Sequence, residues 1–313
     1  MTRFKFINPH IKDIRRNVWH YLLWHLGHYD ETKVENPPSN FVYPGQVKEF
    51  KKEEPYAIWI GHSTYLMEVN GVRILTDPIW EDYCAPVPIW GLKRQTAVPF
   101  ALSDLARIDL VLISHNHYDH LGEKTVLALH RMYPQIEWVV PDRLSPWFHK
   151  RGIDRVTELT WWKNCIAKKC RITAVPAQHY SGRTPWDMNA THWNGYVVEV
   201  GAKRIYFTGD TGYNPEDFKA IGGYFKAMDL SLIPIGTYIP KEFMKTVHIG
   251  PQEAVQIHEE VGSRLSLGMH WRTFGLSDEP LDRPPYDLYL EMKRKNLPFE
   301  TFLPIDVGLR VNF

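Results

Sequence analysis

The sequence predicts an α/β fold, because short apolar segments typical of strands alternate with segments of helical character. The clearest strand is the wholly apolar run 110–113, a pattern typical of a strand buried on both faces. The strongest hairpin signal is Asn70-Gly71, which joins the strand-like segments 65–69 and 72–75. A third observation is positional: candidate ligand residues follow the carboxyl ends of four strands, and open sheets gather ligands at that edge.

Residues 1–50 are predicted to form an N-terminal arm with an amphipathic helix, and residues 51–313 to form the main domain. Asn8-Pro9 precedes a segment from about Ile11 in which basic residues are followed by Trp and Leu residues, until Gly27 ends the pattern. Two interpretations of this helix stay open. It either packs on the main domain or rests on a membrane surface as a basic, Trp-bearing interfacial helix.

From about residue 55 the pattern changes to strands. The expected strands are 57–60, 65–69, 72–75, 110–113, 137–140, 171–175, 196–200, 204–207, 230–233 and 265–269. One helix is expected over 124–132. Another begins near Pro251, because proline is favoured in the first turn, and ends before Gly262, because glycine is favoured after the last turn.

Bulk composition excludes some classes of protein. The 37 basic and 36 acidic side chains give a net charge of +1, which argues against nucleic-acid binding driven by overall charge. The three cysteines are sparse and are interpreted as structural residues in a reducing compartment. The N-terminus lacks the apolar stretch and cleavage site of a secretory signal. These features predict a cytoplasmic protein, soluble or peripheral on a membrane.

A dense cluster of metal-binding residue types follows the strand 110–113. Seven residues are candidate ligands: His115, His117, Asp119, His120, His179, Asp210 and His270. Packing does not require three histidines and an aspartate within the six residues 115–120. Imidazole nitrogens and carboxylate oxygens are ligands that zinc takes.

The spacing predicts two metal ions. Alternate residues on a tight loop can point the same way, so His115 and His117 would bind one ion, and Asp119 and His120 the other. The two oxygens of Asp210 can bridge the ions. Of the remaining candidates, His179 would complete the first site and His270 the second. Two Zn²⁺ per chain are expected, and Mn²⁺ or Fe²⁺ also suit such ligands.

The pattern HxHxDH followed by distant His, Asp and His resembles the metallo-β-lactamase fold superfamily. More specific segments resemble the N-acylphosphatidylethanolamine-hydrolysing phospholipase D family, among them Leu75-Thr76-Asp77-Pro78, Pro176-Ala177-Gln178-His179, Phe207-Thr208-Gly209-Asp210-Thr211 and Met269-His270-Trp271. The resemblance spans residues 55 to 275. It implies an αββα sandwich with a binuclear zinc site at one edge and the ligand assignment given above. It also implies hydrolysis of N-acylated phosphatidylethanolamines to N-acylethanolamine and phosphatidate.

Other functions remain open on the same residues. A metal-dependent lactonase or a small-molecule phosphodiesterase is the alternative, because this fold hosts many substrates. A non-catalytic binding protein is disfavoured, since all seven ligand positions are filled. The expected partners are a phospholipid substrate and a membrane surface, and nucleic acid is not expected, because no basic segment follows the histidine motif. The acyl-chain specificity and oligomeric state are not predicted.

Residues around the ligands are candidates for catalysis and support. Asp119 and His248 are the candidate catalytic residues, with His248 contacting the substrate phosphate or donating a proton, or alternatively capping a helix or lying on the surface. Asp77 and His62 either orient ligand imidazoles or make loop hydrogen bonds. An apolar wall beside the metals, or a cover for another part of the core, is expected from Tyr238, Ile239, Phe243 and Met244.

Overall fold

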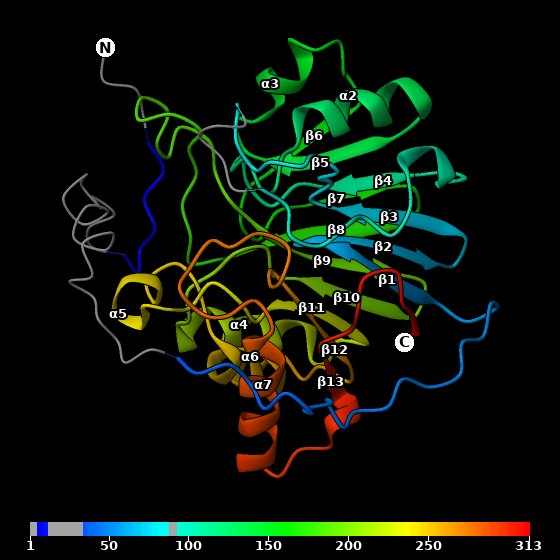
Figure 1. Ribbon diagram of the computed structural model, residues 1–313. Coiled ribbons are helices and arrows are strands. Elements are labelled where there is room, and N and C mark those ends of the chain that lie inside the picture. Colours follow the sequence, from blue (N-terminus) through cyan, green and yellow to red (C-terminus); the bar gives the residue numbers. More distant parts are fainter. Residues whose placement is uncertain (1–4, 12–33, 88–92) are drawn as a thin grey trace.

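The computed structural model describes residues 5–11, 34–87 and 93–313, and these form two seven-stranded sheets (Figure 1). The first sheet contains β1 (Tyr56–Gly61), β2 (Thr64–Val69), β3 (Val72–Thr76), β4 (Leu110–Leu112), β5 (Glu137–Pro141), β6 (Val156–Leu159) and β14 (Arg310–Asn312). The second contains β7 (Asn164–Ala167), β8 (Cys170–Val175), β9 (Gly195–Val200), β10 (Lys203–Phe207), β11 (Leu230–Pro234), β12 (Ser266–Met269) and β13 (Phe302–Leu303). The spatial orders are β14-β1-β2-β3-β4-β5-β6 and β13-β12-β11-β10-β9-β8-β7.

Helices cover the outer face of each sheet (Figure 1). The first sheet carries α2 (Glu123–Met132) and α3 (Ser145–His149), and the second carries α4 (Pro215–Phe225), α6 (Pro251–Glu260) and α7 (Arg283–Arg294). A short helix, α5 (Lys241–Met244), and two 3₁₀ turns, η2 (Leu102–Asp104) and η3 (Phe299–Thr301), lie in the connections. This α-β-β-α layering confirms the predicted fold class.

Strand β1 shows why the sequence gives a sandwich. All six of its residues are buried, and its side chains alternate between two cores because successive residues of a strand point to opposite faces. Ile58 and Ile60 pack with the residues under α2 and α3. Ala57 and Trp59 belong to the core that continues into the second sheet. The strand is therefore apolar on both faces.

Strand direction sets the place of the site. β3, β4 and β5 are parallel, as are β10, β11 and β12. Two buried tyrosines join the sheets: the Tyr196 hydroxyl donates to the Ile113 carbonyl at 2.9 Å, and the Tyr65 hydroxyl donates to the Gly268 carbonyl at 2.7 Å. The carboxyl ends that carry the candidate ligands consequently lie at a common edge.

The described parts of the arm pack on the domain. Two of its contacts are with α7: Arg283 Nη1 donates to the Glu35 carbonyl at 2.7 Å, and the Phe41 ring lies 4.9 Å from the Tyr286 ring. His10 Nε2 lies 3.1 Å from Asp217 Oδ2. The predicted arm helix lies, beyond its first residue, outside the described residues. Within the described ranges, none of the helices combines the length and the apolar character needed to cross a bilayer.

Candidate metal centre

The structure brings all seven predicted ligands into one cluster at the edge where the strands end. Four of them lie in the loop after β4, and the others follow β8, β10 and β12. The His115 Nε2 and His117 Nδ1 atoms are 2.7 Å apart, and His179 Nε2 is 3.3 Å from the same His117 nitrogen. His120 Nε2 lies 3.2 Å from Asp210 Oδ2, and His270 Nε2 lies 3.0 Å from it. The ends of these four strands therefore bring the seven side chains together, as their positions in the sequence suggested.

Hydrogen bonds to the outward-facing nitrogens orient the ligand rings. His179 Nδ1 lies 2.9 Å from the Val247 carbonyl, and His270 Nδ1 lies 3.1 Å from Thr237 Oγ1. His115 Nδ1 likewise lies 2.8 Å from a hydroxyl, that of the preceding serine. Each bond leaves Nε2 directed into the cluster, which is the arrangement that ligand histidines use when an outer partner fixes the ring.

Asp77 has the role of orienting residue that its sequence position suggested. Its carboxylate is fully buried and accepts bonds from the Ser114 N–H at 2.7 Å and from His120 Nδ1 at 2.6 Å. Burial raises the pKa of Asp77, while the bonds from His120 and Ser114 oppose that rise. The Asp77 carboxylate therefore bonds both to the backbone of the loop and to the His120 ring. It makes the loop hydrogen bond and the imidazole contact that the sequence offered as alternatives.

His62 supports a different ligand. Its Nε2 lies 2.9 Å from Asp119 Oδ2, and its ring lies 4.0 Å from that of His270. Burial lowers the pKa of His62 to about 3, and the neighbouring His270 adds to the shift. His62 is therefore neutral and positioned to donate its Nε2–H to the Asp119 carboxylate.

The electrostatics of the cluster favour a bound cation. Burial lowers the pKa of His115 well below its usual range, and His120 adds to this effect. For His270 burial is the largest effect and acts to lower the pKa, but the charge of Asp210 and the hydrogen bonds to Asp119 and Asp210 together outweigh it and raise the value to about 9. Among the described residues, His120 Nε2, His270 Nε2 and Asp210 Oδ1 are buried without a hydrogen-bond partner. Positive charge between these atoms would satisfy all of them, so the donor set fits a divalent metal.

The arm contributes a contact that the sequence did not identify. Asn8 is 1% exposed, and its Nδ2 donates to the Ala177 carbonyl at 3.1 Å and to the His179 carbonyl at 3.4 Å. It thus braces the segment that carries His179. The clue in the sequence was Asn8-Pro9, which shares in the family resemblance. No local pattern marked Thr237 or Val247.

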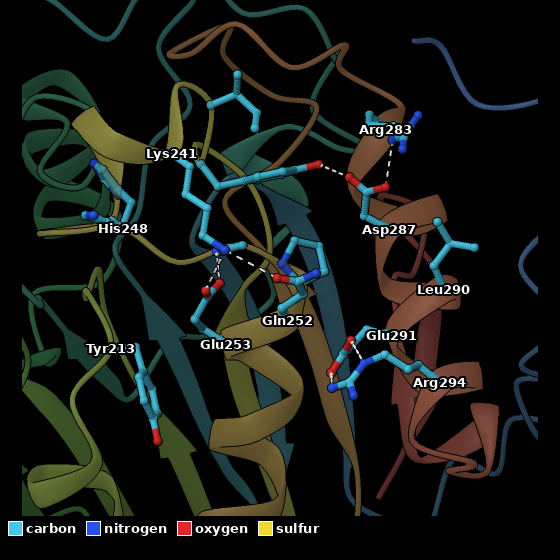
Figure 2. A pocket seen from close by; sticks show the side chains of 15 residues that line it. Tyr213, Lys241, His248, Gln252, Glu253, Arg283, Asp287, Leu290, Glu291 and Arg294 are labelled. Atoms are coloured by element: carbon cyan, nitrogen blue, oxygen red, sulfur yellow. Dashed lines mark hydrogen bonds and ion pairs between the residues drawn. The ribbon is translucent and has the colours of Figure 1, made fainter. Parts of the chain in front are cut away.

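His248 contacts the cluster and is also one of the residues that line a pocket (Figure 2). Its Nδ1 lies 3.8 Å from Asp210 Oδ2, and its ring centroid lies 5.3 Å from that of His179. The same side chain lines the pocket, together with Tyr238 and Ile239. This placement favours a role in the site over a role in helix capping.

The predicted apolar wall is only partly correct. Tyr238 and Ile239 line the pocket as expected. Phe243 and Met244 are 5% and 3% exposed and are not among the pocket-lining residues, so their assignment to that wall is wrong.

Comparison with known proteins relates the chain to metal-dependent hydrolases. Residues 72–271 match the family described as the beta-lactamase superfamily domain. The N-acyl-phosphatidylethanolamine-hydrolyzing phospholipase D 1 of Caenorhabditis elegans is 37% identical over 298 residues, 89% of this chain and 84% of that protein. The mitochondrial N-acyl-phosphatidylethanolamine-hydrolyzing phospholipase D of Saccharomyces cerevisiae is 36% identical over 230 residues, 72% of this chain and 49% of that protein. A solved metallo hydrolase from Ignicoccus hospitalis shares the fold, with a TM-score of 0.64 at 20% identity, covering 83% of this chain and 98% of that one.

The Asp77 geometry predicts a specific loss of metal affinity. Asp77→Ala removes the bond that holds the His120 ring, so zinc affinity should fall by about 10- to 100-fold, the usual effect of removing such a partner. Competition with a chromophoric chelator measures the affinity. The matched control is Asp109→Ala, because Asp109 also accepts a backbone N–H, from Arg73 at 2.9 Å, but lies before β4, at the end of that strand away from the ligand loop. Equal affinities of the Asp77 variant and the wild type would contradict the orienting role.

Proposed function

Because the chain belongs to the beta-lactamase superfamily and, within it, to the N-acylphosphatidylethanolamine-hydrolysing phospholipase D family, we propose that it is a binuclear zinc phosphodiesterase. Its proposed reaction converts N-acylated phosphatidylethanolamines into N-acylethanolamine and phosphatidate. The observation that carries the proposal is the convergence of the seven candidate ligands beside a pocket that begins at His248. The names of the relatives supply the substrate class.

We assign the seven side chains to two zinc ions in two groups joined by one carboxylate. The first group is His115, His117 and His179, and the second is Asp119, His120 and His270; within each group the ligand atoms lie within 4.8 Å of one another. Asp210 Oδ2 lies close to His120 and His270 and also lies 3.8 Å from His179 Nε2. A carboxylate that reaches both groups suits a bridge. Bound divalent ions of this kind polarise a phosphoryl oxygen and lower the pKa of water.

The position of Asp119 supports a role in orienting and deprotonating the attacking water. Its side chain is 15% exposed, against 2% for Asp210, so water reaches Asp119 more readily. The bond from His62 Nε2 fixes Oδ2 of Asp119 in position. We assign Asp119 to orient water toward phosphorus and to accept its proton, a general-base role that requires a positioned carboxylate within reach of the reacting water.

We assign His248 to the side of the leaving group. It contacts the cluster through Asp210 and faces the pocket with the rest of its ring. As the phosphorus–oxygen bond to the ethanolamine breaks, the departing oxygen needs a proton, and His248 can supply it. The water oxygen then remains on phosphorus, and the second product leaves as an alcohol.

An exposed tryptophan beside the site supports contact with a membrane. Trp186 is 77% exposed, and the loop that carries it is tied to the HxHxDH loop. Gly182 N–H donates to Asn116 Oδ1 at 2.7 Å, and Arg183 Nη1 donates to the Leu121 carbonyl at 3.1 Å. Tryptophan is favoured at membrane–water interfaces. We propose that this loop rests on the bilayer that contains the substrate.

Two substitutions test the division between binding and catalysis. His248→Ala should retain two zinc ions and lower turnover by about tenfold or more, the usual size of an acid–base contribution. Asp210→Ala should lose more than one ion, because its carboxylate reaches both groups. Elemental analysis and turnover of the same preparations measure both effects. A single ion in the fully active wild type would refute the binuclear assignment, and full turnover by the His248 variant would refute its role as a proton donor.

The bond that is cleaved provides the test of the reaction. Zinc-loaded protein should convert N-acylphosphatidylethanolamine to phosphatidate and N-acylethanolamine. In ¹⁸O-labelled water the label should enter phosphatidate, because the attack is on phosphorus. Mass spectrometry identifies both products. Formation of diacylglycerol would overturn the assignment, and absence of lipid turnover beside rapid lactone opening would favour the lactonase alternative.

Membrane contact through Trp186 can be measured separately. Trp186→Ser should weaken binding to anionic vesicles several-fold, because the apolar ring is lost from the interface. Turnover of a soluble diester should not change. The control is Tyr224→Ser, which removes an aromatic side chain that is 69% exposed on α4. Co-sedimentation with vesicles is the measurement, and equal loss of binding in the two variants would rule out the specific contact.

A further inference from the structure

The pocket beside His248 has a defined shape. It has a volume of about 600 Å³ and lies between α5, the start of α6 and one face of α7 (Figure 2). The α7 residues that line it follow one helix face, with intervals of three or four positions except for one adjacent pair: Arg283, Asp287, Leu290 with Glu291, and Arg294. The size falls within the range of about 300–1,000 Å³ that is typical of sites for small organic ligands.

The charged side chains of the pocket compensate one another within its wall (Figure 2). The ion pairs are Lys241–Glu253 at 3.2 Å, Arg283–Asp287 at 2.7 Å and Arg294–Glu291 at 2.6 Å. Lys245 is also paired, with Glu242 at 2.7 Å. The wall is therefore rich in polar groups but has little net charge. Such a surface does not favour an anionic ligand, which requires an excess of positive charge when it leaves water.

Apolar surface lies between these ion pairs. Tyr213, Tyr238, Ile239, Pro251 and Leu290 line the pocket. The Tyr238 hydroxyl donates to Asp287 Oδ2 at 2.5 Å, which holds the tyrosine side chain against α7. The alkyl stems of the lysine and arginine side chains can extend the apolar surface further. A neutral ligand with an alkyl chain and a few polar atoms matches this composition.

We propose that the pocket binds the N-acyl chain and amide of the substrate, the fragment that leaves as N-acylethanolamine, while the diacyl fragment lies outside it. This inference rests on the proposed function. A proton donor to the leaving oxygen must face the leaving fragment, and the pocket begins at His248. The charges agree: N-acylethanolamine is neutral, whereas a phosphate monoester carries about −1.5 to −2 at neutral pH.

The test compares two series of substrates with full-length, zinc-loaded protein. One series varies the N-acyl chain from acetyl to palmitoyl with fixed diacyl chains, and the other varies the diacyl chains with a fixed N-acyl group. Leu290→Asp places a charge inside the pocket, at a side chain that is 42% exposed and so tolerant of substitution. The control is Leu309→Asp, since Leu309 is 41% exposed and does not line the pocket.

Leu290→Asp should raise the ratio of KM for the N-palmitoyl substrate to KM for the N-acetyl substrate by about tenfold, because burying the chain is the source of its binding energy. KM values in the diacyl series should not change on Leu290→Asp substitution, and Leu309→Asp should give the same KM ratio as the wild type. Calorimetry of the metal-free protein should show N-palmitoylethanolamine binding that Leu290→Asp weakens by a similar factor. If the wild type hydrolyses the lipids but Leu290→Asp leaves the dependence of KM on N-acyl chain length unchanged, the pocket assignment is wrong and the proposed function stands. If the wild type hydrolyses none of them, the proposed function fails, and the pocket assignment fails with it.

Discussion

The buried carboxylate of Asp77 is the interaction on which the geometry of the cluster depends. Asp77 follows β3, and its own N–H donates to the Leu112 carbonyl at 2.9 Å, which joins the ends of two neighbouring strands. Its side chain then accepts from Ser114 and His120. One residue therefore sets both the path of the histidine loop and the direction of a ligand ring. A buried charge is costly unless it is bonded in this way.

The second sheet supplies the three candidate ligands that the histidine loop does not contain. His179, Asp210 and His270 follow strands of the second sheet. Bonds such as that from the Tyr196 hydroxyl to the Ile113 carbonyl hold the two sheets together. Because interiors are close-packed, these strand ends cannot move independently. The site is therefore closed on the side of the protein core and partly exposed at His117, Asp119 and His248.

The ligand cluster and the pocket have different roles in the proposed function. One fold can host many different substrates, so the fold alone does not determine the substrate. The pocket is built from α5, α6 and α7, outside the HxHxDH loop, and its compensated charges favour a neutral fragment. Under the proposed function, the strand ends supply reactivity and the helices that follow β11 supply selectivity. His248 belongs to both parts.

The sequence by itself determined the alternation of strands and helices and four of the seven candidate ligands, because apolar periodicity and the HxHxDH spacing are local properties of the chain. The other three, His179, Asp210 and His270, were predicted from their positions after strands and from the family resemblance. Only the tertiary structure showed that Thr237, Val247 and Asn8 hold the ligand segments, since these contacts join residues far apart in the sequence. It also decided that Phe243 and Met244 are buried away from the pocket, because composition does not reveal the direction in which a short helix turns its side chains. Likewise, α7 becomes a wall of the pocket only when the chain has folded back beside α6, which no local pattern encodes.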